Sequence, residues 1–382
     1  MKFKWRRILI FTCFLLLLTF FIFANVSLFG NYQDSNFDNN QIGAESINNH
    51  FTGNVEVWGK AAISEYFWLH IFGEEKEKVS GMLLYEGSLK IQDIFLNYKS
   101  GPYLTQSTCN VNVENLVIIL NGREDTKVNK AKAWLDFLLF SGNLRRLKNL
   151  GIIILGNEAC QNSWINRYLH LGILKFIFIV YDVKINSNKI FQWPLGVATY
   201  RHFPLIPKTG IDVNNKRKYK CNFLGTVYPN SSRERLKTLL DQESFNCYVK
   251  TRSFWLAKES KNSMDLYHQV LKDSDFTLCP VGINSESYRV YESMSYGSIP
   301  ILEDKTTEGV CDINGPYRLL KKYEAPVIYI KDWTELKGMF NKGTFTERKI
   351  VNLRKRILDW YEIFKYKIRE EFLDALSSNF QN

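Results

Sequence analysis

The 382-residue sequence lacks the cysteine and histidine spacings of a zinc site and the dense basic stripe of a nucleic-acid-binding protein. No C-x-x-C pair occurs, and the five histidines share no local motif. The 50 Lys and Arg residues exceed the 39 Asp and Glu residues, giving a net charge of +11, but they are spread along the chain. This distribution argues against nucleic acid and favours small anionic partners such as sugar nucleotides or phosphorylated acceptors.

The N-terminus predicts insertion into a membrane. Four basic residues among the first seven precede an apolar run over 8–29. The run is close to the ~20 residues that cross a bilayer, and its positive flank is expected to stay cytosolic. We therefore expect a cytosolic tail at 1–7, a signal-anchor transmembrane helix at 8–29 and a luminal stem at 30–54. A cleaved signal peptide is the alternative, although no convincing A-x-A site follows the run.

Six of the seven cysteines follow this stem. In an oxidising compartment they allow up to three disulfides, whose pairing the sequence does not determine. Asn230-Ser231-Ser232 is an acceptor sequence for N-glycosylation, so Asn230 is a predicted glycosylation site.

From Val55 onward, short buried apolar runs alternate with amphipathic helical patterns, which predicts an α/β protein with parallel sheets. A proline-containing, weakly patterned segment around 192–220 separates two Rossmann-like domains. We expect an N-terminal, acceptor-side domain at 55–215 and a C-terminal, nucleotide-sugar-binding domain at 216–345. A helix within 346–382 is expected to pack back across both. Two such domains facing a cleft, behind a single span and stem, are typical of a Golgi glycosyltransferase of the GT-B type.

The stretch 275–303 reads as strand, loop, helix and strand. Ligands of open parallel sheets bind beyond the carboxyl ends of the strands, near the N-terminus of the next helix. Arg289 lies in the first turn of this helix, and its guanidinium could bind a diphosphate together with the loop amides near Ser285. The Gly225-Thr226 turn, at the end of another predicted strand, could also approach a phosphate closely.

Glu292 lies three residues after Arg289, on the same helical face, and could accept hydrogen bonds from two ribose hydroxyls. A solvated ion pair between the two residues is the alternative. The predicted donor-binding set comprises Gly225, Thr226, Ser285, Tyr288, Arg289 and Glu292.

Asp273-Ser274-Asp275 has the D-x-D spacing of metal-dependent transferases. Because it lies between the end of a predicted helix and the start of a predicted strand, we interpret it as a structural boundary. No metal ligands and no cofactor are predicted, and turnover is expected to be metal-independent.

Six ordered blocks resemble the ribitol β-1,4-xylosyltransferase family, also called transmembrane protein 5. The blocks are VWGKAAI, NLVIILNGRE, LGNEAC, FQWPLGVATYRHFP, CNFLGTVYPNSSR and SDFTLCPVGINSESYRVYESMSYGSIPILED, and the resemblance covers roughly residues 55–376. More distantly, Arg289, Glu292, Gly297 and Pro300 are similar to the donor-site signature of exostosin-like transferases.

The resemblance implies transfer of xylose from UDP-xylose to ribitol 5-phosphate on the O-mannosyl glycan of α-dystroglycan. It also implies a single-pass type II protein of the Golgi membrane, working after fukutin and the fukutin-related protein. A catalytically silent, Golgi-anchored partner that organises fukutin-type enzymes is an alternative, as is a transferase with another sugar donor.

An α-linked donor giving a β-linked product requires inversion, hence a general base for the acceptor hydroxyl. Glu124, Glu158 and Asp182 each follow a predicted strand of the first domain, so they are the candidate bases. Each also has a structural interpretation: Glu124 and Asp182 as helix caps or partners of an arginine, and Glu158 as a residue that fixes its loop.

Overall fold

The computed structural model describes residues 51–140, 142, 146–181, 187–256, 258–307, 309, 311, 316–341 and 343–381, which all lie within one compact unit, Asn49–Asn382. The expected tail, span and most of the stem lie outside the described residues, as does Asp182. Among the helices in the described ranges, none is both long and apolar enough to span a bilayer.

Two sheets lie within this unit, and we call the parts of the chain that form them the first and the second domain. The first domain is built on a sheet with the strand order β2-β3-β4-β1-β5-β6-β7-β8. All neighbours from β4 to β8 pair in parallel, whereas β2, β3 and β4 pair antiparallel at one edge. Every residue of β6 is buried, as expected for a parallel strand covered on both faces. The strands are β1 (Gly53–Gly59), β2 (Glu77–Lys78), β3 (Tyr85–Ile91), β4 (Ile94–Ser100), β5 (Asn115–Asn121), β6 (Asn149–Leu155), β7 (Leu174–Val180) and β8 (Ile190–Gln192).

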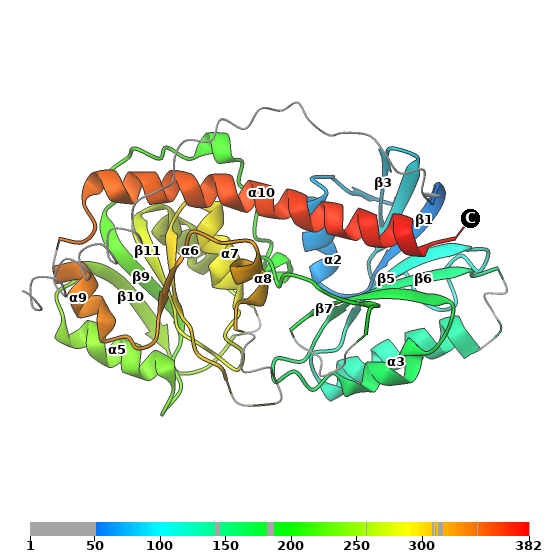
Figure 1. The fold of residues 1–382 in the computed structure, drawn as a ribbon, viewed down its shortest axis with the longest axis horizontal. Coiled ribbons are helices and arrows are strands. Elements are labelled where there is room, and N and C mark those ends of the chain that lie inside the picture. The colour runs from blue at the N-terminus through cyan, green and yellow to red at the C-terminus, as the bar shows by residue number, and fades with distance from the viewer. Residues whose placement is uncertain are drawn as a thin grey trace, which may run out of the picture. The chain divides into compact units, whose positions relative to one another are not determined.

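Helix α3 (Asp125–Phe140) covers one face of this sheet (Figure 1). Its buried stripe is Ala131, Trp134, Leu135 and Leu138, the stripe that helical spacing predicts. The other helical segments of this part of the chain are short: α2 (Ile63–Glu65), the π-helical η1 (Tyr66–Ile71), η2 (Ser163–Ile165), α4 (Asn166–Leu169), η3 (Thr199–Arg201) and η4 (Lys208–Gly210).

The second domain has an entirely parallel sheet with the order β10-β9-β11-β12-β13. Its strands are β9 (Tyr219–Thr226), β10 (Cys247–Arg252), β11 (Ser274–Cys279), β12 (Ile299–Glu303) and β13 (Ile328–Ile330). They alternate with α5 (Ser232–Gln242), α6 (Lys261–Lys272), α7 (Tyr288–Ser295), α8 (Arg318–Lys322) and α9 (Glu335–Asn341).

The long helix α10 (Glu347–Asn379) contacts both domains, as Figure 1 shows. Near its start, Arg354 pairs with Asp275 of β11 at 2.7 Å. Near its end, Phe372 packs edge-to-face against Phe67 and Phe176 of the first domain. The helix thus fastens the second sheet to the first by buried contacts along its whole length.

Two disulfides form among the described residues. Cys221–Cys247 joins neighbouring positions of β9 and β10, and Cys160–Cys311 joins a loop of the first domain to a loop of the second. Cys109 and Cys279 are free.

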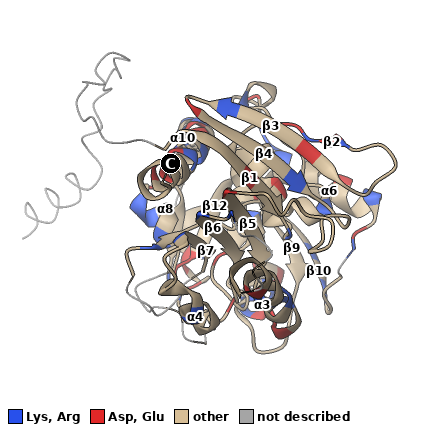
Figure 2. Ribbon diagram, turned by 90° about the vertical axis from the view of Figure 1, so that its right-hand side faces the viewer, with Lys and Arg blue, Asp and Glu red and all other residues tan. Residues whose placement is uncertain are grey.

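Acidic and basic residues are interspersed over the ribbon, as Figure 2 shows for the charges of both signs. This arrangement agrees with a chain whose positive excess is distributed rather than gathered into one stripe.

Candidate functional site

Two arginines occupy equivalent positions in the second domain. Arg233 is the second residue of α5, which follows β9, and Arg289 is the second residue of α7, which follows β11. Strand order reverses between β9 and β11, because β10 lies outside β9 while β12 lies beyond β11. Ligands of open parallel sheets bind at such a switch point, at the carboxyl ends of the strands. Both guanidinium groups therefore lie where a ligand is expected.

Arg289 is held by backbone and by an aromatic ring. Its Nη2 donates a hydrogen bond to the carbonyl of Leu224, and the guanidinium lies 5.1 Å from the centroid of the Phe223 ring. Its Nε and Nη1 are buried and have no hydrogen-bond partner within the described residues. A phosphate would satisfy these N–H groups, since guanidinium binds phosphate oxygens in pairs.

Arg233 is a second guanidinium of the same kind, which the sequence analysis missed. Its Nη1 donates to the Thr226 carbonyl at 3.1 Å, and its Nε is buried without a partner in the described part of the chain. Burial, followed by the positive charge of Arg289, lowers the pKa of Arg233 to about 10. Its position just after the Gly225-Thr226 turn, matching that of Arg289, was the signal in the sequence.

Neither of these arginines forms an ion pair with a carboxylate in the described ranges. Two partly buried like charges are unfavourable unless an anion compensates them. The pair is therefore a candidate anion-binding site of the second domain.

Gly225 makes room for one of the two guanidinium groups. A Cβ at this position would approach Arg289 Nη2 to 2.8 Å, so any larger residue would push the guanidinium away. The neighbouring Thr226 is buried, and its hydroxyl donates to the Phe254 carbonyl at 3.4 Å. The turn thus leaves room for the Arg289 guanidinium and is hydrogen-bonded to the loop after β10.

The loop before α7 brings together Ser285, Ser287 and Tyr288. The Ser285 carbonyl accepts a hydrogen bond from the Tyr317 hydroxyl at 2.9 Å, which fixes the loop. Ser287 is the N-cap residue that precedes α7, yet its Oγ is buried and makes no hydrogen bond within the described chain. The Tyr288 ring lies 5.7 Å from that of Tyr200, which comes from the segment between the two sheets.

Glu292 is buried, 5% exposed, and does not pair with Arg289. Its Oε1 accepts the Ala198 N–H at 3.1 Å, and its Oε2 accepts the Tyr267 hydroxyl at 2.6 Å. Burial raises the pKa of this carboxyl. The solvated ion pair considered from the sequence is thus wrong, because α7 is inside the protein. The ribose role stays a prediction, and it would use the remaining lone pairs of these oxygens.

Among the candidate bases, Glu158 lies where the two domains meet. It follows β6, its carboxylate pairs with Arg123, and its backbone carbonyl accepts a hydrogen bond from Asn284 of the second domain at 2.8 Å. Burial by itself would lower the pKa of Arg123, but the charge of Glu158 acts in the opposite direction together with Tyr181, Tyr288 and Tyr200, and the net shift of this pKa is upward. Charges of Glu158 also act on Tyr200 and Tyr288.

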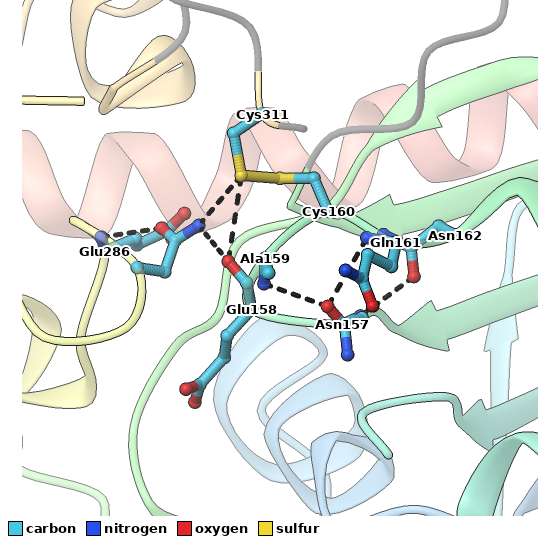
Figure 3. The surroundings of a disulfide bond; sticks show 9 residues. Asn157, Glu158, Ala159, Cys160, Gln161, Asn162, Glu286 and Cys311 are labelled. Carbon is cyan, nitrogen blue, oxygen red and sulfur yellow. Dashed lines mark hydrogen bonds between the residues drawn. A yellow bond between two sulfur atoms is a disulfide. The ribbon is translucent and has the colours of Figure 1, made fainter. Parts of the chain in front are cut away.

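The loop that carries Glu158 is tightly fixed (Figure 3). Asn157 donates to the Arg123 carbonyl at 2.9 Å and accepts the Ala159 N–H at 2.9 Å. Cys160, two residues after Glu158, is disulfide-bonded to Cys311. The Glu158 carboxylate points away from that bond.

Glu124 has a different setting. Its backbone carbonyl accepts the first N–H groups of α3, and its exposed carboxylate lies 4.0 Å from Lys127 Nζ. These contacts are those of a helix start, and none of them involves the arginines or Glu158. Asp182 lies outside the described residues, so its candidacy stays a prediction.

The D-x-D segment lies at the opposite end of β11 from the arginines. Asp275 binds Arg354, and the Ser274 hydroxyl donates to the Val270 carbonyl at 2.8 Å. Among the described residues, no group of three or more His, Cys, Asp or Glu side chains could hold a metal ion.

The predicted glycosylation site Asn230 is exposed and has a positive φ of 58°. Its backbone N–H donates to Glu234 at 2.7 Å. The third residue of the acceptor sequence, Ser232, is buried, and its hydroxyl contacts Glu303 and Trp333.

Comparisons with known proteins cover nearly all of the described chain. The family models "RXYLT1 N-terminal domain" and "RXYLT1 C-terminal domain" match residues 55–194 and 200–381. Ribitol-5-phosphate xylosyltransferase 1 of Homo sapiens is 40% identical over 339 residues, which are 85% of this chain and 76% of that protein. The Danio rerio protein of the same name is 39% identical over 338 residues, 86% of this chain and 78% of that protein.

Similarity to solved structures is much lower. A trehalose-phosphate synthase (UDP-forming) from Burkholderia xenovorans covers 85% of this chain and is itself covered completely, with 9% identity and a TM-score of 0.43. A likeness at this level supports no functional conclusion.

Proposed function

The chain belongs to the ribitol-5-phosphate xylosyltransferase 1 (RXYLT1) family, and on that premise we propose that it transfers xylose from UDP-xylose to a ribitol 5-phosphate acceptor. Identity near 40% over three quarters of each relative supports the reaction. The observation that supports the donor side most is the pair of half-buried arginines, Arg233 and Arg289, which have buried N–H groups and no ion-pair carboxylate among the described residues. We further propose that the two domains form a GT-B-type transferase.

In this proposal the arginines bind the diphosphate of UDP. Negative charge develops on the departing UDP as the bond to xylose breaks, and preorganised cations stabilise it. Arg289 and Arg233 are already oriented by the Leu224 and Thr226 carbonyls, so little reorganisation is needed. The Gly225-Thr226 turn and the Ser285–Tyr288 loop would border the same diphosphate, with Glu292 at the ribose.

Glu158 is the proposed general base. Inversion requires a carboxylate on the acceptor side to take the proton of the attacking hydroxyl. Glu158 lies on the first domain, faces the second, and is held in place by Arg123 and by its fixed loop. Asp182 is the remaining candidate for this role.

The setting of the reaction is part of the proposal. We place the protein in the Golgi membrane as a single-pass type II protein and its acceptor on the O-mannosyl glycan of α-dystroglycan. In that order of reactions it acts after fukutin and the fukutin-related protein. The basic balance of the chain suits an anionic donor and an anionic acceptor.

Calorimetric titration with UDP tests the donor site. Arg289→Ala and Arg233→Ala should each weaken UDP binding by roughly ten- to a hundredfold, because a hydrogen bond to a charged group contributes ~1.5–3 kcal/mol. Arg235→Ala, on the same helix but half-exposed, is the matched control and should leave UDP affinity unchanged. Unchanged affinity in both arginine variants would reject the diphosphate site.

Release of UDP from UDP-xylose in the presence of ribitol 5-phosphate tests the chemistry. Glu158→Gln should lower kcat by ~10²–10⁴ without changing UDP affinity, whereas Glu124→Gln should have little effect. Asp182→Asn belongs in the same series, since a larger loss of kcat in this variant would assign the general base to Asp182. Turnover should persist in EDTA.

The same assay separates the alternatives. Faster release from a UDP-sugar other than UDP-xylose would identify a different donor. Intact UDP binding without any release would favour the silent partner of fukutin-type enzymes.

A further inference from the structure

An exposed aromatic surface borders the arginine pair and has no role in the proposed reaction. The loop after β10 presents Phe254, Trp255 and Leu256 with 61%, 53% and 38% of their surfaces exposed. Tyr200, from the segment between the sheets, is 38% exposed beside them. We call Tyr200, Phe254, Trp255 and Leu256 the aromatic ledge. Neighbouring exposed apolar side chains on a soluble domain commonly mark a binding surface.

Arg201 holds the aromatic ledge together. Its guanidinium lies 5.3 Å from the Tyr200 ring centroid and 5.9 Å from that of Trp255, and its Nη2 donates to the Leu256 carbonyl at 2.8 Å. Arg201 and Arg252 share a single carboxylate, Glu259, at 3.5 and 2.5 Å. The ledge therefore combines aromatic faces with two neighbouring arginines that pair with the same carboxylate.

The ledge is continuous with the proposed catalytic site. The Tyr200 ring lies 5.7 Å from that of Tyr288, the residue before Arg289. On the other side, the Phe254 carbonyl accepts the Thr226 hydroxyl at 3.4 Å. A molecule bound along Trp255 and Tyr200 would thus lead directly to the arginines and to the meeting point of the domains.

The position of the ledge argues for the acceptor rather than for the donor base. Nucleotides bind at the switch point, which lies between β9 and β11. The ledge extends from β10, which is an edge strand of the sheet, and it comprises three consecutive exposed side chains of one loop together with Tyr200. Sugar rings have apolar faces that stack on aromatic side chains, and the positive charge of the ledge suits a glycan that carries phosphate.

We propose that the aromatic ledge binds sugar rings of the acceptor glycan that lie beyond the ribitol phosphate. This inference rests on the proposed function, since it extends the acceptor side of the same site. We therefore expect the enzyme to prefer ribitol phosphate that is carried on an oligosaccharide over free ribitol 5-phosphate.

The test compares two acceptors with the purified full-length protein: free ribitol 5-phosphate and an O-mannosyl glycopeptide ending in ribitol 5-phosphate. Trp255→Ala should raise KM for the glycopeptide about three- to tenfold, as expected for loss of one aromatic stacking contact. KM for free ribitol 5-phosphate and the affinity for UDP should not change. Trp255→Tyr should restore most of the glycopeptide affinity, because the ring is kept.

Tyr366→Ala is the matched control, since Tyr366 is an equally exposed aromatic residue (54%) on α10, outside the ledge. A weaker affinity for UDP in Trp255→Ala would assign the ledge to the donor base and overturn the proposal. An equal change of KM for both acceptors would overturn it as well.

A binding measurement tests the aromatic ledge independently of xylose transfer. Surface plasmon resonance with immobilised glycopeptide and no donor should show weaker binding by Trp255→Ala than by the wild type. That loss would support the ledge even if xylose transfer failed, whereas equal binding would reject it even if transfer succeeded.

Discussion

Arg233 and Arg289 are unusual because these half-buried side chains contact backbone carbonyls and an aromatic ring instead of carboxylates. The contrast with Arg354 is instructive. That side chain, 2% exposed, binds Asp275 and the carbonyls of Val213 and Asn215, so its charge serves the packing of α10. Residues of the same type thus differ in whether the fold gives their charge a carboxylate partner.

His70 provides a pH-dependent contribution to stability at the residue scale. It is buried and stacked 5.5 Å from Tyr66, and burial, together with the charge of Lys365, lowers the pKa of His70 to about 4. An unfolded histidine has a pKa near ~6.5. As pH falls from 6.5 to 4, the unfolded chain binds a proton that the folded protein does not, so the folded state loses stability.

We predict that this loss amounts to about 3 kcal/mol across that window. The glutamine of the His70→Gln variant does not titrate, so the unfolding free energy of this variant should fall less than that of the wild type between pH 6.5 and 4. Urea unfolding at several pH values measures the difference. His170→Gln, at an exposed position, should keep the wild-type pH dependence. Parallel curves for the wild type and His70→Gln would contradict the prediction.

At the scale of elements, α10 is the part of the chain that belongs to both domains. Its first half contacts the second domain through Arg354 and through Trp360, whose Nε1 donates to the Tyr323 carbonyl at 2.6 Å. Its second half lies on the first domain, where Phe372 is fully buried among aromatic rings. The apolar stripe of this helix therefore continues from one core to the other.

Phe372→Ala should destabilise the protein by ~3–5 kcal/mol, because a large cavity would open between the helix and the first sheet. Urea denaturation followed by circular dichroism gives this value. Ile363→Ala, on the same helix but 54% exposed, should change stability by no more than about 0.5 kcal/mol. Similar losses of unfolding free energy in the two variants would show that the packing of Phe372 does not contribute the predicted stability.

At the scale of the whole molecule, Cys160–Cys311 joins the two domains beside the proposed base. The bond closes a loop with a sequence separation of 151, whereas Cys221–Cys247 closes one of 26 within a single sheet. A cross-link over a longer segment removes more conformational freedom from the unfolded chain. The interdomain disulfide is thus expected to contribute more to stability than the one within the sheet.

Replacing both Cys160 and Cys311 by Ser should lower the free energy of unfolding by about 2–5 kcal/mol. Cys109→Ser, at a free cysteine, is the control and should have little effect. Thermal unfolding with and without a reductant measures the stability of the double variant and of the Cys109→Ser control. A reductant should remove most of the difference between the wild type and the double variant, and a double variant as stable as the wild type would contradict the expectation.

Local patterns in the sequence were sufficient for the elements that are uniformly buried. The apolar runs at 116–120, 151–155 and 276–279 are among those that predict an α/β protein, and they form β5, β6 and β11, because parallel strands covered on both faces are continuously apolar. The strands β3, β4 and β10 are not evident from such runs. These strands lie at or near sheet edges with mixed burial, so their polar residues obscure the pattern.

The sequence by itself determined the α/β class, the family and the position of Arg289 at the start of a helix after a buried strand, because these depend on local spacing and on residue identity. Only the tertiary structure decided which charges go without partners, which cysteines pair and which aromatic rings remain exposed. Those properties depend on contacts between segments far apart in the chain. Arg233 comes to lie beside Arg289 because β9 and β11 are neighbours in one sheet. Cys160–Cys311 forms only when the two sheets have been brought together, and the aromatic ledge only when the segment between the sheets lies beside the loop after β10.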